Sequence, residues 1–301
     1  MGVENGPEHI VGNHPGDVNL CSLIKANTKF RNISIDTVCS DYEDGRHRPA
    51  LLEKKYPAVK NLSLFLSQKQ DIEEKVFEAS NSGNFVLSLG GDHSIAFGTV
   101  SGMKKKHPNL AVVWVDAHAD INTLASTNSG NLHGCAASFL LGLNEDTDFG
   151  NPMMKEKLDA SQLGYIGLRD VEQCEKTILS KLHIHPNAVA SAIDVEKHGI
   201  LSSLRKVLHS IDPSNCRPIH LSFDIDALDP LEAPATGTPV PAGLSLREGI
   251  IICEELYNTG RLVSMDLVEV NISIAQNQQE AERTKSAAQA LILSALGQKY
   301  L

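Results

Sequence analysis

Short apolar runs recur along this chain at the length expected of buried β-strands. Each run is rich in Val, Ile, Leu or Phe and is followed directly by a glycine or a charged residue. A continuous apolar run, without strict alternation of polar residues, is typical of a strand that is covered on both faces of a sheet. The runs are residues 85–89, 111–115, 163–168, 219–223 and 262–268.

Longer segments with apolar residues at helical spacing separate most of these runs. They are residues 94–106, 172–182, 195–211, 246–258 and 278–296. Strands that alternate with helices predict βαβ units and therefore a parallel sheet. Loops are expected at 124–134, 143–151 and 229–243. Because no repeat, low-complexity tract or break in composition divides the chain, we expect a single α/β domain.

The residues capable of chemistry come directly after the predicted strands. In an open parallel sheet the carboxyl ends of the strands share one edge, and ligands bind there. Five strands therefore deliver candidate site residues to one rim of the sheet. These residues are Asp92 with His93, the segment 116–120, Arg169 with Asp170, the segment 224–226, and Glu269.

The charge and the cysteines exclude several classes of partner. The 301 residues include 27 Lys and Arg against 37 Asp and Glu, for a formal net charge of −10. A mildly acidic protein is a poor match for nucleic acid or an anionic membrane. Six scattered cysteines without a C-x-x-C pair are typical of reduced thiols in an intracellular protein. Since there is also no apolar leader and no run long enough to span a bilayer, we expect a cytoplasmic protein.

Three potential metal ligands lie within five residues at the end of the 111–115 strand. If the backbone stays extended, Asp116, His118 and Asp120 point the same way, because side chains alternate along a strand. Two carboxylates and an imidazole form a ligand set for a divalent cation. One such segment is equally typical of a strand-to-loop turn. The strand at 219–223 repeats the pattern, however, because Asp224 and Asp226 follow it.

His93 completes a set of six potential ligands, although alone it would be more typical of a packed or capping side chain. Four carboxylates at one rim would repel one another and raise their pKa values unless cations neutralise them. Six ligands serve two ions only if some carboxylates bridge, as in sites with metals about 3.5–4 Å apart. Carboxylates with histidine suit Mn²⁺ best, with Fe, Co and Zn as alternatives. Two such ions generate hydroxide near neutral pH, so the pattern predicts metal-assisted hydrolysis.

Six motifs of this chain resemble, in order and spacing, those of the ureohydrolase family, and of its arginases most closely. They are GGDHS at 90–94, DAHADIN at 116–122, SGNLHG at 129–134, SFDIDALDP at 222–230, PATGTPV at 234–240 and MDLVEVN at 265–271. The resemblance implies one three-layer αβα domain around a parallel sheet. It also implies a centre of two Mn²⁺ ions per chain and hydrolysis of L-arginine to L-ornithine and urea.

The resemblance distributes the ligands between the two ions. One ion is expected to be held by His93, Asp116, Asp120 and Asp224, and the other by Asp116, His118, Asp224 and Asp226. Asp116 and Asp224 would bridge both ions. In the mechanism that the resemblance implies, a hydroxide bridging the metals attacks the guanidinium carbon, and Asp120 accepts the remaining proton.

Three further motif residues are expected to act at the guanidinium group. His133 in SGNLHG matches the proton shuttle of the family, in keeping with an imidazole pKa near neutrality. Glu269 in MDLVEVN matches the carboxylate that pairs with the guanidinium fork. Thr238 is expected to line the site near the same group.

The amino-acid end of the substrate should decide specificity within the family. The residues that resemble arginase contacts to the α-carboxylate, direct or through water, are Asn122, Thr127, Ser129 and Asn131. Glu172 and Glu175 stand where the family contacts the ammonium group. Arginases usually have Asp at the position of Glu172, so the carboxylate is displaced by one methylene. A change of this size is expected to alter KM more than the reaction type.

Two other hypotheses remain beside arginase. Agmatinase, or another guanidino- or formimino-compound hydrolase, is the neighbouring enzyme, and the α-carboxylate contacts disfavour it because agmatine lacks that group. A catalytically impaired member with a binding or regulatory role is the other, and the complete ligand set disfavours it. Residues 2–7 resemble a segment that normally follows the first strand of the family, and Met1 precedes them directly, so that strand is expected to be missing. A homotrimer is expected from the resemblance alone.

Overall fold

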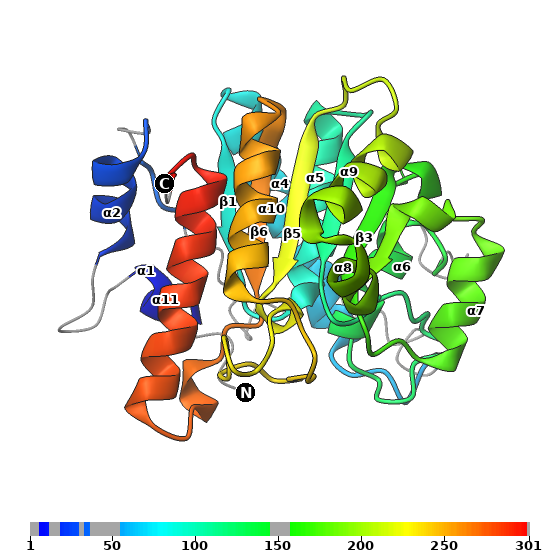
Figure 1. Ribbon diagram of the computed structural model, residues 1–301. Helices are drawn as coiled ribbons and strands as arrows, with labels where there is room; N and C mark the ends of the chain where they lie inside the picture. The colour runs from blue at the N-terminus through cyan, green and yellow to red at the C-terminus, as the bar shows by residue number, and fades with distance from the viewer. Residues whose placement is uncertain (1–5, 12–18, 30–32, 37–54, 145–156, 300–301) are drawn as a thin grey trace.

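A six-stranded parallel sheet forms the centre of the protein (Figure 1). The structure is a computed structural model that describes residues 6–11, 19–29, 33–36, 55–144 and 157–299. Along the sheet the order is β1-β6-β5-β2-β3-β4, and every neighbouring pair is parallel. The strands are β1 (Val86–Leu89), β2 (Ala111–Val115), β3 (Leu163–Leu168), β4 (Val189–Ser191), β5 (Ile219–Asp224) and β6 (Leu262–Val268).

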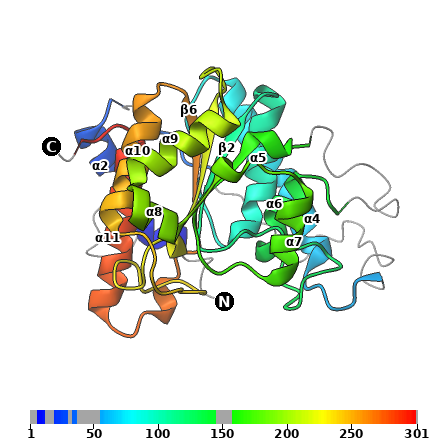
Figure 2. The same ribbon diagram turned by 45° about the vertical axis from the view of Figure 1, so that its right-hand side comes forward.

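Helices cover both faces of this sheet and complete three αβα layers (Figure 2). One face carries α4 (Leu62–Asn81), α5 (Ala96–Lys106), α6 (Ala136–Leu140) and α7 (Gln173–Lys181). The opposite face carries α1 (Gly6–Val11), α2 (Leu20–Asn27), α8 (Ala192–His198), α9 (Ile200–Ile211), α10 (Leu246–Asn258) and α11 (Gln278–Ala295). The predicted parallel αβα fold is confirmed.

Strand β2 shows why the sequence pattern is a continuous apolar run. Ala111, Val113 and Val115 pack into the core on the side of α9 and α10, whereas Val112 and Trp114 pack on the side of α4 and α5. All five side chains have no exposed surface. Burial of a large apolar side chain contributes roughly 1.5–3 kcal/mol, so both faces of this strand stabilise the sheet that holds the site.

The structure corrects the prediction of one long helix over residues 195–211. Gly199 separates α8 from α9, and its φ of 79° and ψ of 150° lie far from helical values. Glycine adopts such a positive φ at little cost, whereas the apolar spacing on either side of it resembles one helix. Strand β4 and helix α4 were not predicted; β4 has only three residues, Val189–Ser191, which is too short for a periodic signal.

Two predictions fall partly outside the described residues. Of residues 2–7, only Gly6 and Pro7 are described, in α1, so the missing first strand remains a prediction. Most of the loop expected at 143–151 also lies outside the described part of the chain. Among the described residues, no helix has both the length and the apolar character needed to cross a membrane.

Candidate active site

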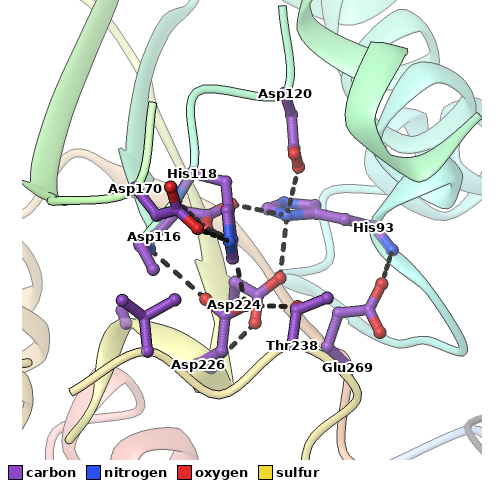
Figure 3. A network of polar contacts seen from close by, with 12 residues as sticks. His93, Asp116, His118, Asp120, Asp170, Asp224, Asp226, Thr238 and Glu269 are labelled. Carbon is purple, nitrogen blue, oxygen red and sulfur yellow. Dashed lines mark hydrogen bonds and ion pairs between the residues drawn. The ribbon is translucent and has the colours of Figure 1, made fainter. Parts of the chain in front are cut away.

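The candidate ligands meet at the carboxyl ends of strands β1, β5 and β2 (Figure 3). Short backbone turns follow strands β2 and β5 and aim the side chains. In the first turn Asp116 Oδ1 accepts the backbone N–H of His118 at 2.7 Å. In the second, Asp224 Oδ1 accepts the backbone N–H of Asp226 at 2.8 Å. Because Asp forms such local bonds readily, each strand end presents two potential ligands.

His93 forms the first ligand group. Its Nδ1 atom lies 3.0 Å from Asp116 Oδ2, 3.1 Å from Asp120 Oδ2 and 3.3 Å from Asp224 Oδ2. His93, Asp116 and Asp120 together place one ligand atom each within 4.8 Å of one another. The structure therefore brings together the four residues that the sequence assigns to one ion.

His118 forms the second ligand group. Its Nδ1 atom lies 3.4 Å from Asp116 Oδ1 and 3.1 Å from Asp226 Oδ2. Asp116 thus offers one oxygen to each histidine, which is the geometry of a bridging carboxylate. Of the two histidines, only His93 is in contact with Asp224 among the described residues, so the predicted bridging role of Asp224 remains a prediction.

The surroundings of His93 Nδ1 show whether this set of donor atoms suits a cation. The atom is buried and has no hydrogen-bond partner among the described residues, although carboxylate oxygens surround it. The ring is fixed from its other side, since Nε2 lies 2.9 Å from Ser222 Oγ and the ring stacks on Trp114 with centroids 4.1 Å apart. A buried imidazole nitrogen oriented by its second nitrogen is typical of a metal ligand. The residues therefore fit a metal centre.

The pKa shifts of the cluster show that it takes up positive charge. Burial, and then repulsion from Asp116, raises the pKa of Asp120 to about 7. Burial and neighbouring carboxylates also raise the pKa of Asp224 and Asp226. Burial lowers the pKa of His118, but hydrogen bonds to Asp116 and Asp226 raise it overall to about 12. Protons occupy such a cluster when no metal is bound, and divalent cations replace them.

Glu269 connects His133 to the ligand cluster. Its Oε1 atom accepts the backbone N–H of His93 at 3.0 Å and lies 3.0 Å from His133 Nδ1. This hydrogen bond to Glu269 raises the pKa of His133 to about 9. Both Glu269 and Asp120 have positive φ values, 61° and 49°, which side-chain-bearing residues seldom adopt. Such backbone strain concentrates at functional sites.

Thr238 joins the cluster through a loop that Arg169 holds in place. Thr238 Oγ1 donates a hydrogen bond to Asp226 Oδ2 at 2.9 Å. The Arg169 guanidinium donates to the carbonyl oxygens of Asp226 at 2.7 Å, Ala227 at 3.1 Å and Val240 at 2.7 Å. Arg169 therefore ties both ends of the loop that carries Thr238 to the end of strand β3.

The predicted α-carboxylate contacts lie on one loop between β2 and α6. Within it, Thr127 Oγ1 accepts the Gly130 N–H at 3.1 Å, and Ser129 Oγ accepts the Asn131 N–H at 3.2 Å. Asn122 is buried and donates through Nδ2 to Glu172 Oε1 at 3.0 Å. These bonds give the loop a defined shape without any charged side chain of its own.

Glu172 and Glu175 differ in how much of each carboxylate is free for a ligand. Glu175 is buried, and its oxygens accept the backbone N–H groups of Ile121 at 3.1 Å and Glu172 at 2.9 Å. It therefore positions the backbone around the site. Glu172 is exposed and accepts the side-chain amides of Asn122 and Asn128, each at 3.0 Å. The predicted ammonium contacts of both residues remain predictions.

Comparison with known proteins decides the family. A sequence model described as the arginase family matches residues 2–297. The chain belongs to the arginase family. It is 39% identical over 304 residues to an arginase of Eremothecium gossypii, covering 100% of this chain and 73% of that protein. It is 44% identical over 261 residues to the hepatic arginase of Aquarana catesbeiana, covering 85% and 80% of the two chains.

Solved arginase structures share the fold as well. The crystal structure of Entamoeba histolytica arginase in complex with L-ornithine has a TM-score of 0.80 at 27% identity, covering 99% of this chain and 92% of that chain. The arginase of Bacillus caldovelox has a TM-score of 0.75 at 30% identity, covering 89% and 84%. The resemblance to arginases seen in the sequence is thus confirmed.

Some residues around this arginase-family site were missed by sequence reasoning. Ser222 and Trp114 orient His93, and Asn128 binds Glu172. Lys60 contacts the α-carboxylate loop from a distant part of the chain. Alternation along β5, which places Ser222 on the same face as Asp224, could have identified one of them.

Proposed function

We propose that this arginase-family protein hydrolyses L-arginine to L-ornithine and urea. The observation that carries the proposal is the pair of ligand groups, around His93 and His118, that share Asp116. Known proteins support the proposal, because relatives named arginase match the chain over most of its length. A related arginase structure also holds L-ornithine, the expected product.

Two Mn²⁺ ions per chain are part of the proposal. His93, Asp116, Asp120 and Asp224 would hold one ion, and Asp116, His118, Asp224 and Asp226 the other. When bound, the ions supply a water of lowered pKa as the nucleophile. Mn²⁺ is preferred because the donors are carboxylate oxygens and imidazole nitrogens, without a cysteine thiolate.

The protein's own groups bind the guanidinium and move protons. Glu269 uses Oε1 for His93 and His133, which leaves Oε2, beside Gly237, as an acceptor for the guanidinium. Thr238 lies next to Asp226 and lines the same region. Asp120 accepts the proton of the nucleophile, because its carboxylate lies in the His93 ligand group, where the metal-held water would be. His133 delivers a proton to the leaving amine.

The other end of the substrate is an α-amino acid. Asn122, Thr127, Ser129 and Asn131 bind the α-carboxylate, and Glu172, with Glu175 behind it, binds the ammonium group. Polar groups on a structured loop support this assignment, because they can satisfy a carboxylate by hydrogen bonds alone. We also propose a cytoplasmic location, on the basis of the cysteine pattern. A single domain is proposed because no break in composition divides the chain, and a homotrimer is proposed from the resemblance to arginases.

Urea release from L-arginine and from agmatine tests this function. The Mn²⁺-loaded protein is expected to show a kcat/KM at least about a hundredfold higher for L-arginine, because the polar groups of the loop lose their partner when the carboxylate is absent. A preference for agmatine would contradict the arginase assignment and favour the agmatinase alternative. Absence of turnover with either substrate, despite bound metal, would favour a binding or regulatory role.

A further inference from the structure

Residues 55–61 lie against the loop that carries the α-carboxylate contacts. The Lys60 N–H donates to the Gly130 carbonyl at 2.9 Å, and Lys60 Nζ donates to Asn131 Oδ1 at 3.0 Å. The two segments approach so closely that a Cβ atom on Gly130 would lie 1.9 Å from the Ala58 carbonyl oxygen. Gly130 also has a φ of 72°, so glycine is required at this contact. Lys60 is therefore fixed against the loop by both its backbone and its side chain.

The Lys60 ammonium fixes the orientation of the Asn131 amide. An ammonium group can only donate hydrogen bonds, so it must bind the amide oxygen. The NH₂ end of Asn131 is then left to donate elsewhere. Ser129 is also left as a hydrogen-bond donor. Its oxygen already accepts the Asn131 N–H, and its hydroxyl hydrogen is used in no bond between described residues. The loop consequently presents donors, which is the polarity that binds an anion.

Charge makes Lys60 more important than its single hydrogen bond suggests. Residues 122–131 include no charged side chain. The neighbouring rim is strongly acidic, with carboxylates from Asp116, Asp120, Asp224, Asp226 and Glu269 (Figure 3). Glu172 adds a further carboxylate beside Asn122. Bound metal ions offset the charge at the ligand cluster, but the α-carboxylate of a substrate would lie at the uncharged loop. Lys60 supplies a positive charge at that loop.

We propose that Lys60 is a positioning residue that determines specificity for the substrate α-carboxylate. It holds the Asn131 amide with its N–H groups available to the carboxylate, and its charge favours an anionic group at the loop. This inference rests on the proposed function, because it assumes an α-amino acid substrate. It predicts that Lys60 distinguishes L-arginine from agmatine, which has the same guanidinium but no carboxylate.

Steady-state kinetics of three variants test the proposal. Lys60→Met keeps the apolar stem but removes the charge and the donors, and Lys60→Arg keeps both. We expect Lys60→Met to raise the KM for L-arginine about tenfold, equivalent to about 1.4 kcal/mol, with kcat changed by less than about threefold. Lys60→Arg should stay within about twofold of the wild type in KM. Lys197→Met, an exposed lysine of α8, is the matched control and should leave KM unchanged.

Agmatine and ionic strength provide readouts that a merely structural role would not move. In Lys60→Met, kcat/KM should fall for L-arginine and not for agmatine, whereas a general loss of folded or metal-loaded protein would lower it for both substrates. The KM of the wild type for L-arginine should rise with ionic strength as the exposed charge is screened, and this dependence should weaken in Lys60→Met. The ionic-strength series with the wild type and Lys60→Arg remains decisive if Lys60→Met does not fold.

The results separate this inference from the proposed function. If the wild type hydrolyses L-arginine but Lys60→Met has an unchanged KM, the role of Lys60 is wrong and the function stands. An equal loss for both substrates, or a wild-type KM independent of ionic strength, overturns the role of Lys60 in the same way. If the wild type does not hydrolyse L-arginine, the function itself fails and the inference fails with it.

Discussion

At the scale of single residues, Glu269 decides the protonation of His133. Its carboxylate lies 3.0 Å from His133 Nδ1 and is the main reason that the pKa of this imidazole is raised to about 9. Glu269→Gln keeps the size of the side chain but removes its charge. In the metal-free protein, we expect the His133 pKa to fall towards about 6.5, the ordinary value for histidine.

An NMR titration of the His133 ring measures this change. Glu196→Gln, an exposed substitution in α8, serves as the control and should leave the His133 pKa near 9. An unchanged His133 titration in Glu269→Gln would show that another group stabilises the imidazolium. In the proposed reaction, His133 must release its proton to the leaving amine, so this coupling also sets the pH range in which turnover proceeds.

At the scale of elements, Arg169 links strand β3 to the loop that carries Thr238. Its guanidinium reaches carbonyl oxygens from Asp226 to Val240. Lysine cannot reproduce this planar fork of donors, so Arg169→Lys removes hydrogen bonds to the carbonyl oxygens of Asp226 and Val240. We expect the free energy of unfolding to fall by about 1–3 kcal/mol.

The midpoint of urea denaturation in the metal-free protein checks this prediction. Arg205→Lys on α9 is the control, because Arg205 is exposed, and it should leave the midpoint within error of the wild type. If Arg169→Lys unfolds at the wild-type midpoint, the guanidinium bonds do not stabilise the loop. Metal-free protein is used so that a change in metal affinity does not contribute.

The elements also show which parts of the fold the sequence predicts. Strands at 111–115, 163–168 and 262–268 were predicted with the bounds that the structure has, because runs buried on both faces are mainly apolar, although Ser264 and Asp266 interrupt the last of them. The break at Gly199 and the short strand β4 carry no periodic signal. For the site, ligands next to strand ends could be predicted, since the parallel sheet brings those ends together. The role of Lys60 could not be predicted from the sequence, because it depends on contact with Asn131, which lies 71 residues away in the chain.

At the scale of the whole molecule, stability should depend jointly on pH and metal. The pKa of Asp120 rises from 3.8 to about 7, that of His133 from 6.5 to about 9, and that of His118 from 6.5 to about 12. Each folded pKa lies above the unfolded pKa of the same group. At pH values between the two, the folded metal-free protein therefore binds more protons than the unfolded chain. Its stability therefore falls as pH rises from about 4 to about 12.

Manganese should reverse this trend, because the ions replace the protons of the cluster. We expect the rise in Tm on adding Mn²⁺ to be larger at pH 8 than at pH 5.5. Each kcal/mol of added stability corresponds to roughly 2–4 °C for a protein near this size. Thermal melts with and without Mn²⁺ across this pH range measure the effect. A rise in Tm that is equal at both pH values, or larger at pH 5.5, would contradict the assignment of protons and metal to the same residues.

The central claim is that two ions held at the ends of strands β1, β2 and β5 make this protein an arginase. Its most direct test is urea release from L-arginine measured against the number of Mn²⁺ ions bound per chain. We predict that activity rises to its maximum at about two ions per chain, and that Asp120→Ala releases no urea at any loading because it lacks a ligand and the proton acceptor. Full activity at one ion or fewer per chain, or full activity of Asp120→Ala, would contradict the account.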